Sequence, residues 1–132
     1  MTAAIFKEGK YVLFSNDEIS DLKVNTKQSS TGRFRHCLHQ SHQDKIQEMI
    51  IGISSSSYCR PHSHPKGISE SYSIIEGILL VLFFDQNGSV SEKVILSKES
   101  TRVLRINSSM IHMPLSLSEV TIYHETLTGP FQ

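Results

Sequence analysis

The sequence predicts an all-β protein, arranged as an antiparallel sandwich or barrel. Turn signals recur about every 8–12 residues between short strand-like segments, which is the spacing of such folds. The pair Asn87-Gly88 separates two of these segments and is typical of a tight hairpin turn. No long segment of the 132-residue chain has helical periodicity. A chain of this length is expected to form a single domain.

The remaining elements follow from local residue choice. Residues 16–24 are predicted to form a helical turn with Ser15 or Asn16 as its N-cap. Pro61 and Pro65 keep residues 58–64 extended, because proline lacks an N–H donor and restricts the residue before it. A long β-rich stretch is expected to break at Gly77. The predicted strands are residues 10–14, 34–39, 46–53, 71–84, 90–96, 102–106, 111–115 and 120–126.

Charge and composition argue against several classes of function. Thirteen basic and thirteen acidic side chains cancel, which is unlike the basic surface of a nucleic-acid-binding protein. The longest apolar run, residues 78–84, is far shorter than the roughly 20 residues that span a bilayer. The N-terminus lacks a signal-peptide pattern, and two cysteines are too few for a disulfide framework. We expect a cytoplasmic protein that binds neither nucleic acid nor membranes.

Three of the seven histidines belong to one pattern that indicates a metal site. His62 and His64 are two residues apart, so in an extended segment both imidazoles point to the same side. Glu70 follows after a loop that can turn the chain back, and His112 lies beyond the hairpin. Three imidazoles and one carboxylate suit one divalent ion such as Fe, Mn, Ni, Cu or Zn, and affinity alone does not choose among them. An octahedral ion would keep two positions open, whereas tetrahedral zinc would be closed.

This pattern resembles the first motif of the cupin superfamily, G-x5-H-x-H-x(3,4)-E-x6-G. The match covers His62, His64, Glu70 and Gly77, with one extra residue before Glu70 and Ser56 in place of the first glycine. The second motif, P-x-G-x2-H-x3-N, is represented by His112 alone. The resemblance implies a cupin double-stranded β-helix, a jelly-roll type barrel that holds its metal inside the mouth. Residues 1–132 would form a single cupin domain, with 1–33 as an N-terminal extension and 34–132 as the barrel core.

A narrower resemblance covers about three quarters of the chain. It is carried by residues 35–39, 44–49, 58–64, 84–88, 112 and 125–130, the last of which contain Glu125 and Gly129-Pro130. In their order these segments resemble the WbuC-type cupin metalloproteins, which are found among bacterial O-antigen polysaccharide genes. The resemblance implies a small polar substrate, such as a sugar or a sugar nucleotide used in surface-polysaccharide synthesis.

Other polar residues are candidates for contacts with a substrate. Arg35, Cys37 and His39 are spaced two residues apart, so in a strand all three share one face, which either lines the barrel or is plain surface. Gln47 could place its amide in the pocket or at its rim. Arg60 lies near the predicted ligands and suits a phosphate or carboxylate, although an exposed arginine is an equal alternative.

Glu125 receives conflicting predictions. It shares a face with Tyr123, while Val120 and Ile122 occupy the other face of the same predicted strand. Apolar content would put Val120 and Ile122 in the core and Glu125 outside. The family resemblance instead favours a role for Glu125, either lining the pocket or paired with an arginine. Tyr123, on the same face, is a candidate for contact with the substrate. Both alternatives remain open at the level of sequence.

The leading functional hypothesis is a metal-dependent isomerase, epimerase or lyase, with the metal as Lewis acid and His39 or Glu125 as the base. An Fe(II)-dependent dioxygenase would use the same ligands. A non-catalytic, metal-dependent binding module is a third alternative, and it predicts no acid or base near the ion. The apolar face that carries Ile78, Leu80 and Leu82 also predicts a homodimer.

Overall fold

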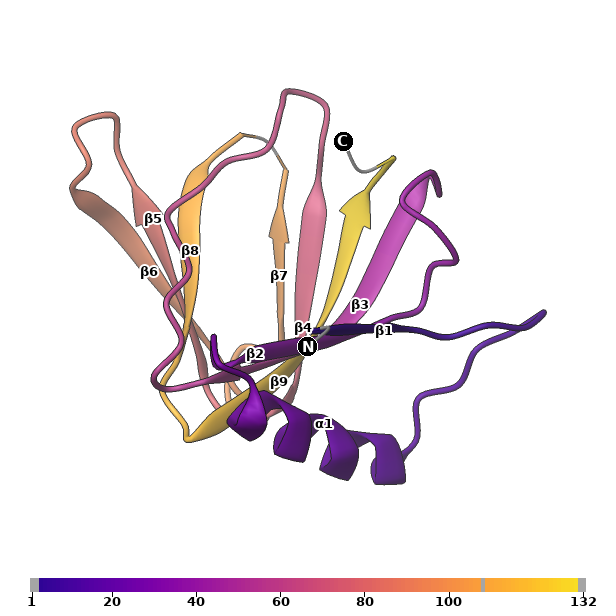
Figure 1. Ribbon diagram of the computed structural model, residues 1–132. Coiled ribbons are helices and arrows are strands. Elements are labelled where there is room, and N and C mark those ends of the chain that lie inside the picture. The colour runs from indigo at the N-terminus through magenta and orange to yellow at the C-terminus, as the bar shows by residue number, and fades with distance from the viewer. Residues whose placement is uncertain (1–2, 108, 131–132) are drawn as a thin grey trace.

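The computed structural model describes residues 3–107 and 109–130, which form two facing β-sheets and one helix (Figure 1). The larger sheet has the strand order β1-β2-β3-β9-β4-β7, and the smaller sheet has the order β6-β5-β8. The predicted all-β fold is therefore confirmed. The elements are β1 (Ala4–Phe6), α1 (Asn16–Gln28), β2 (Arg33–Cys37), β3 (Ile46–Ser54), β4 (Glu70–Glu76), β5 (Leu79–Phe84), β6 (Val90–Leu96), β7 (Val103–Ile106), β8 (Ile111–Ser116) and β9 (Val120–Thr128).

The N-terminal region differs from the prediction. Residues 10–14 form no strand, and their large side chains Tyr11 and Leu13 are mostly exposed. The first strand is instead β1, which pairs in parallel with β2 at the edge of the larger sheet. Residues 10–14 have strand-forming side chains, but a strand also needs a hydrogen-bonded neighbour.

Helix α1 covers the outer face of the larger sheet, across β2, β3 and β9 (Figure 1). It begins after Ser15, whose backbone N–H donates to the Glu18 carboxylate at 3.1 Å as in a capping box. The helix continues past the predicted end at residue 24 to Gln28. Its buried Leu22 packs in an apolar layer with the outward-facing strand residues Phe34, Ile50, Val120 and Ile122. Within the described residues, no helix has both the length and the apolar character needed to cross a membrane.

The main core lies between the two sheets. It joins buried residues of the larger sheet, such as Tyr72 and Tyr123, to Leu79 and Phe83 of the smaller sheet. The predicted turn after β5 is present, with the Asp85 N–H donating to the Ser89 carbonyl at 2.9 Å. These contacts set the separation of the two sheets, and a cavity lies between them.

Gly77 lies where the chain passes from β4 in the larger sheet to β5 in the smaller one. Its φ is +86°, and a Cβ there would lie 2.9 Å from the Val120 carbonyl oxygen. Both the left-handed backbone and the close approach require glycine. The predicted break at Gly77 is confirmed, and its physical reason is this change of sheet.

Candidate metal centre

Three separate parts of the chain bring the predicted ligands together. Glu70 is the first residue of β4 in the larger sheet, and His112 lies on β8 in the smaller sheet. His62 and His64 lie in the segment that joins β3 to β4. His62 and His112 form a β-bridge, in which the N–H of His62 donates to His112 at 3.0 Å and the N–H of His112 donates back at 2.9 Å. This bridge holds the His-x-His segment against β8.

The four side chains converge on one point. The ligand nitrogens of His62, His64 and His112 lie within 4.8 Å of one another, so they can hold one metal ion. The Glu70 carboxylate spans two of them: its Oε2 is 3.1 Å from His64 Nε2, and its Oε1 is 2.5 Å from His112 Nε2. Glu70 and His112 are 3% and 1% exposed, whereas His64 is half-buried. The cluster therefore has one sealed side and one accessible side.

Backbone hydrogen bonds aim two of the imidazoles inward. Nδ1 of His112 is 2.8 Å from the Met110 carbonyl oxygen, and Nδ1 of His62 is 3.0 Å from the Arg60 carbonyl oxygen. A carbonyl only accepts, so Nδ1 donates its proton and the neutral ring keeps a lone pair on Nε2. The buried Nε2 of His112 has no hydrogen-bond partner among the described residues, despite its 2.5 Å distance from Glu70 Oε1. Two atoms this close need a positive charge between them, which a proton on Nε2 supplies or, in its place, a cation that both atoms ligate.

Tyr72 holds the Glu70 carboxylate in place through a hydrogen bond. Its hydroxyl donates to Glu70 Oε1 at 3.2 Å, and burial raises the pKa of Tyr72 well above its usual value, so it stays a donor. Burial also acts to raise the pKa of Glu70, but the adjacent His112 and then His64 outweigh it and hold that pKa below its usual range. Glu70 is therefore ionised and oriented, as a metal ligand must be.

His62 has a second neighbour in Cys59. The Cys59 Sγ lies 3.9 Å from His62 Nδ1, and this contact is the main cause that raises the pKa of His62 to about 9. The same contact lowers the pKa of Cys59. Ligation through His62 Nε2 would displace a proton from the ring.

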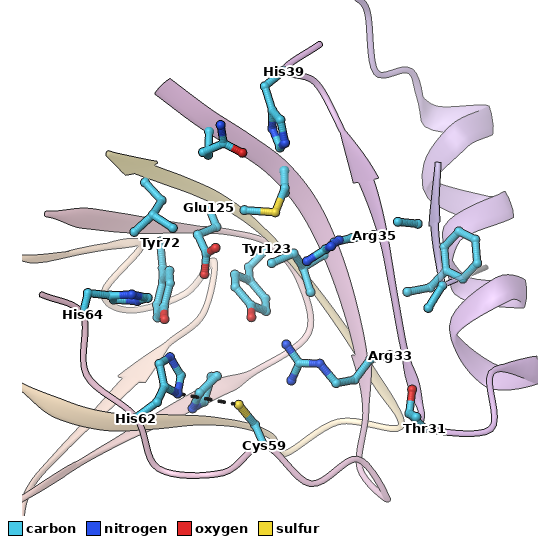
Figure 2. A pocket seen from close by; sticks show the side chains of 18 of the residues that line it. Thr31, Arg33, Arg35, His39, Cys59, His62, His64, Tyr72, Tyr123 and Glu125 are labelled. Atoms are coloured by element: carbon cyan, nitrogen blue, oxygen red, sulfur yellow. Dashed lines mark hydrogen bonds between the residues drawn. The ribbon is translucent and has the colours of Figure 1, made fainter. Parts of the chain in front are cut away.

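A cavity of about 640 Å³ opens onto the imidazoles of His62 and His64 (Figure 2). Cavities of this size commonly hold small-molecule ligands. Much of its polar wall comes from inward-facing residues of β2 and β9, which are Arg33, Arg35, Tyr123 and Glu125. The candidate metal centre thus adjoins a space in which a small molecule could reach the ion.

The sequence of residues 14–96 matches a protein family described as a domain of unknown function, DUF6016. The chain belongs to the DUF6016 family. The matched residues make up more than half of the chain, and they include α1, the strands β2 to β6 and the predicted ligands His62, His64 and Glu70. No curated protein matches the sequence.

Solved structures show that this DUF6016 protein has the cupin fold. The Cupin_2 domain of an XRE family transcriptional regulator from Enterobacter cloacae matches with a TM-score of 0.57 and 19% identity, over 74% of this chain and 97% of that chain. The capsular polysaccharide assembling protein CapF from Staphylococcus aureus matches with a TM-score of 0.58 and 15% identity, over 68% of this chain and 24% of that one. A conserved protein of unknown function from Streptococcus pyogenes matches with a TM-score of 0.63 and 12% identity, over 100% of this chain and 98% of that one.

The DUF6016 chain spans only part of several other matched structures, namely 51%, 52% and 28% of their lengths. At such low identities the likeness concerns the fold alone. The predicted single-domain cupin jelly roll is confirmed, and the cluster of three histidines fits a metal-binding member of that fold.

The cavity brings together most of the other residues that the sequence singled out in this DUF6016 protein. Those that line it are Arg35, His39, Gln47, Tyr123 and Glu125. Arg60, in contrast, is exposed and does not line this cavity. The amide of Gln47 is used within the protein, since its Nε2 donates to backbone carbonyls of the loop at 41–44, the nearest at 2.8 Å.

His39 lies at the opposite end of the cavity from His62 (Figure 2). It is buried, and its Nδ1 is 3.0 Å from the backbone nitrogen of Glu48. His39 is therefore a fixed part of the wall, away from the metal ligands. Of the two bases that the sequence suggests, Glu125 points into the middle of the cavity, between Tyr72 and Tyr123 (Figure 2).

Glu125 faces this cavity, which settles the conflict in the sequence. Val120 and Ile122 are buried on the opposite face of β9, under α1, so both faces of the strand are covered. Burial raises the pKa of Glu125 to about 7, and the charge of Glu70 acts in the same direction. At neutral pH, this carboxyl can therefore both accept and donate a proton.

Two residues of the site, Arg33 and Tyr72, were not predicted from the sequence. Arg33 lies two residues before Arg35 and shares its face, but the predicted strand began one residue too late, at 34. Tyr72 lies two residues after Glu70 and faces the same side. Alternate residues of a strand share a face, so the positions two residues from Arg35 and from Glu70 were also candidates for the site.

Proposed function

We propose that this protein is a metal-dependent enzyme that acts on a small polar molecule, such as a sugar or sugar nucleotide in surface-polysaccharide synthesis. The observation that carries the proposal is the convergence of His62, His64, His112 and Glu70 beside a cavity of about 640 Å³. The same cavity contains Glu125, a carboxyl group whose pKa is raised to about 7. A binding module has no need of such a group.

The chemistry that these residues support is proton transfer at carbon. When bound, the metal supplies Lewis-acid polarisation of a carbonyl or hydroxyl oxygen of the substrate. Tyr72 holds the Glu70 carboxylate in place, and the cavity wall orients the substrate. Where the polarised group is a carbonyl, Glu125 accepts a proton from the carbon beside it, the carbonyl takes up the electron pair, and Glu125 returns the proton to the same or a neighbouring atom. That sequence is an epimerase or isomerase reaction, and loss of a leaving group instead makes it a lyase.

The proposal of a sugar substrate is based on similarity to other proteins. The sequence resembles the WbuC-type cupins of O-antigen gene groups, and the fold relative CapF is described as a capsular polysaccharide assembling protein. We also propose that the protein is cytoplasmic, because free thiols such as those of Cys37 and Cys59 are typical of a reducing compartment. We also include a homodimer formed through the outer face of the smaller sheet, where Ile78 and Ile95 are exposed, and light scattering measures that state directly.

Metal analysis tests the site itself. Protein purified without chelator should carry one divalent ion per chain, and His112→Ala should lose it. His124→Ala is the matched control, because His124 pairs with Glu48 at 2.7 Å outside the cluster and should leave the metal content unchanged. Equal metal loss in both variants, or a wild-type chain without metal, would remove the basis of the proposal. Zinc or manganese would favour Lewis-acid chemistry, and iron would favour the dioxygenase alternative.

Hydrogen exchange tests the reaction. The metal-loaded protein in deuterated water should wash out the carbon-bound proton next to the carbonyl of at least one member of a panel of keto sugars and sugar nucleotides, followed by NMR. Glu125→Gln should slow this exchange by about 10²–10⁴-fold and keep the metal. Substrate-dependent oxygen consumption without exchange would mean a dioxygenase. A metal-loaded protein that binds sugars without either reaction would be a binding module.

A further inference from the structure

Two arginines on β2 form a second polar feature of the cavity, separate from the metal ligands. Arg33 and Arg35 occupy alternate positions of the strand, so both side chains leave its inner face, while Phe34 between them packs under α1. Both line the cavity. Figure 2 shows the two side chains reaching from β2 towards Tyr123, with His62 and His64 on the far side of the space.

Within the described residues the charges of these two arginines are only partly balanced, by the buried Glu125 that interacts with both. Neither Arg33 nor Arg35 takes part in an ion pair among the described residues. The Nη1 of Arg33 is buried and has no hydrogen-bond partner in the described ranges. A buried donor without a partner costs free energy, more so on a charged group, so its presence calls for a partner from outside the chain.

The one acid on this side of the cavity leaves an excess of positive charge. Glu125 faces two guanidinium groups and lies outside ion-pair distance of both. At the metal centre, a divalent ion would likewise exceed the single charge of Glu70. A neutral sugar would leave both excesses uncompensated, whereas an anionic molecule would offset them.

We propose that Arg33 and Arg35 form an oxyanion subsite that receives the carboxylate or phosphate group of the substrate, while another oxygen of the same molecule faces the metal ligands. The guanidinium fork matches the two oxygens of a carboxylate or phosphate, and it binds them more strongly than a neutral hydroxyl. The contact of the same molecule with the metal ligands rests on the proposed function, whereas the oxyanion subsite itself does not. It defines the substrate class as acidic or phosphorylated sugars.

Three sugars that share one ring test the subsite by calorimetry: glucose, glucuronate and glucose 1-phosphate. Metal-loaded wild-type protein should bind at least one of the two anionic sugars about tenfold or more tightly than glucose. Arg33→Gln should remove this preference and leave any glucose binding unchanged, and Arg35→Gln should weaken it. The preference of glucuronate over glucose 1-phosphate, or the reverse, identifies the anion. Equal binding of all three sugars by wild-type protein would overturn the subsite.

Arg60→Gln is the matched control, because Arg60 is exposed and lies outside the cavity. It should keep the preference for anionic sugars, and a loss equal to that of Arg33→Gln would show a general charge effect and overturn the proposal. Arg33→Lys separates charge from geometry: it should fold like wild type and recover only part of the preference. Circular dichroism and a melting curve check each variant, and Arg35→Gln carries the test if Arg33→Gln does not fold.

Metal-free protein distinguishes failure of the subsite from failure of the proposed function. Inorganic phosphate should raise the melting temperature of chelator-treated wild-type protein and not that of Arg33→Gln. If this holds and the wild type never binds metal, the subsite stands without the enzyme proposed above. If metal binds as expected and neither phosphate nor the anionic sugars distinguish the variants, the metal centre stands and the subsite is wrong.

Discussion

The two faces of the larger sheet are both covered, but by different partners. The outer face, with Phe34 and Ile122, lies under α1 and is apolar. On the same strands, the inner face carries Arg33 and Glu125 and lines the cavity. In most half-exposed strands the polar side chains face water and the apolar ones face the core. Here the polar side marks the binding space, because the apolar side already has a helix to cover it.

The largest expected effect comes from the outer layer. Ile122→Ala removes a fully buried side chain beneath α1 and should lower the free energy of unfolding by about 2–5 kcal/mol. Urea unfolding measures this change. Metal content per folded chain should not change, since Ile122 is on the face away from the cavity. Ile46→Ala, at a mostly exposed position of β3, should cost clearly less. Equal costs would mean that α1 does not seal this face.

A change on the inner face should instead lower the metal affinity and leave the free energy of unfolding nearly unchanged. Tyr72→Phe removes the hydroxyl that donates to Glu70 and should lower metal affinity by about 10–100-fold. Competition with a coloured chelator measures the affinity, and urea unfolding of the metal-free protein should show little change. Unaltered affinity would show that Glu70 needs no support from Tyr72.

The smallest effect concerns a histidine on the outer face. His36 is 5% exposed, lies edge-on to Phe14 with ring centroids 5.2 Å apart, and has no hydrogen-bond partner for either ring nitrogen in the described ranges. Burial lowers its pKa below the usual value of 6.5, with Lys7 acting in the same direction and Asp21 against it.

Because the folded protein binds this proton less readily than the unfolded chain does, the contribution of His36 to stability is present above about pH 6.5. It is lost as the pH falls toward the folded pKa. His36→Leu should therefore be more stable than wild type, and by a larger margin at about pH 5 than at about pH 7. Urea midpoints at both values measure the difference between the two proteins. A margin that does not depend on pH would show that His36 is not the group that titrates.

Local patterns predicted much of the candidate site. The His-x-His spacing and Glu70 lie within one short stretch, and extended geometry alone puts the two imidazoles on one side. His112 is a different case, because its position depends on the bridge that pairs it with His62 from a distant part of the chain. The second cupin motif is reduced to this one residue, and the structure nevertheless brings it to the cluster.

Arg33 and Glu125 show where local reasoning ends. The period of two along a strand groups them with Arg35 and Tyr123, but it does not say which face meets a cavity. That choice depends on α1, which packs on β9 and β2 from a separate part of the chain.

The amino-acid sequence by itself determined the strands from β2 to β9, the turn at Gly88, the break at Gly77 and the kinds of atoms offered to a metal, since each depends on neighbours within a few residues. The tertiary structure decided which faces are covered, which imidazole completes the cluster and which charges share the cavity. Those outcomes depend on contacts between segments far apart in the chain. A residue pattern records the alternation of a strand, but not the partner that lies against each side of it.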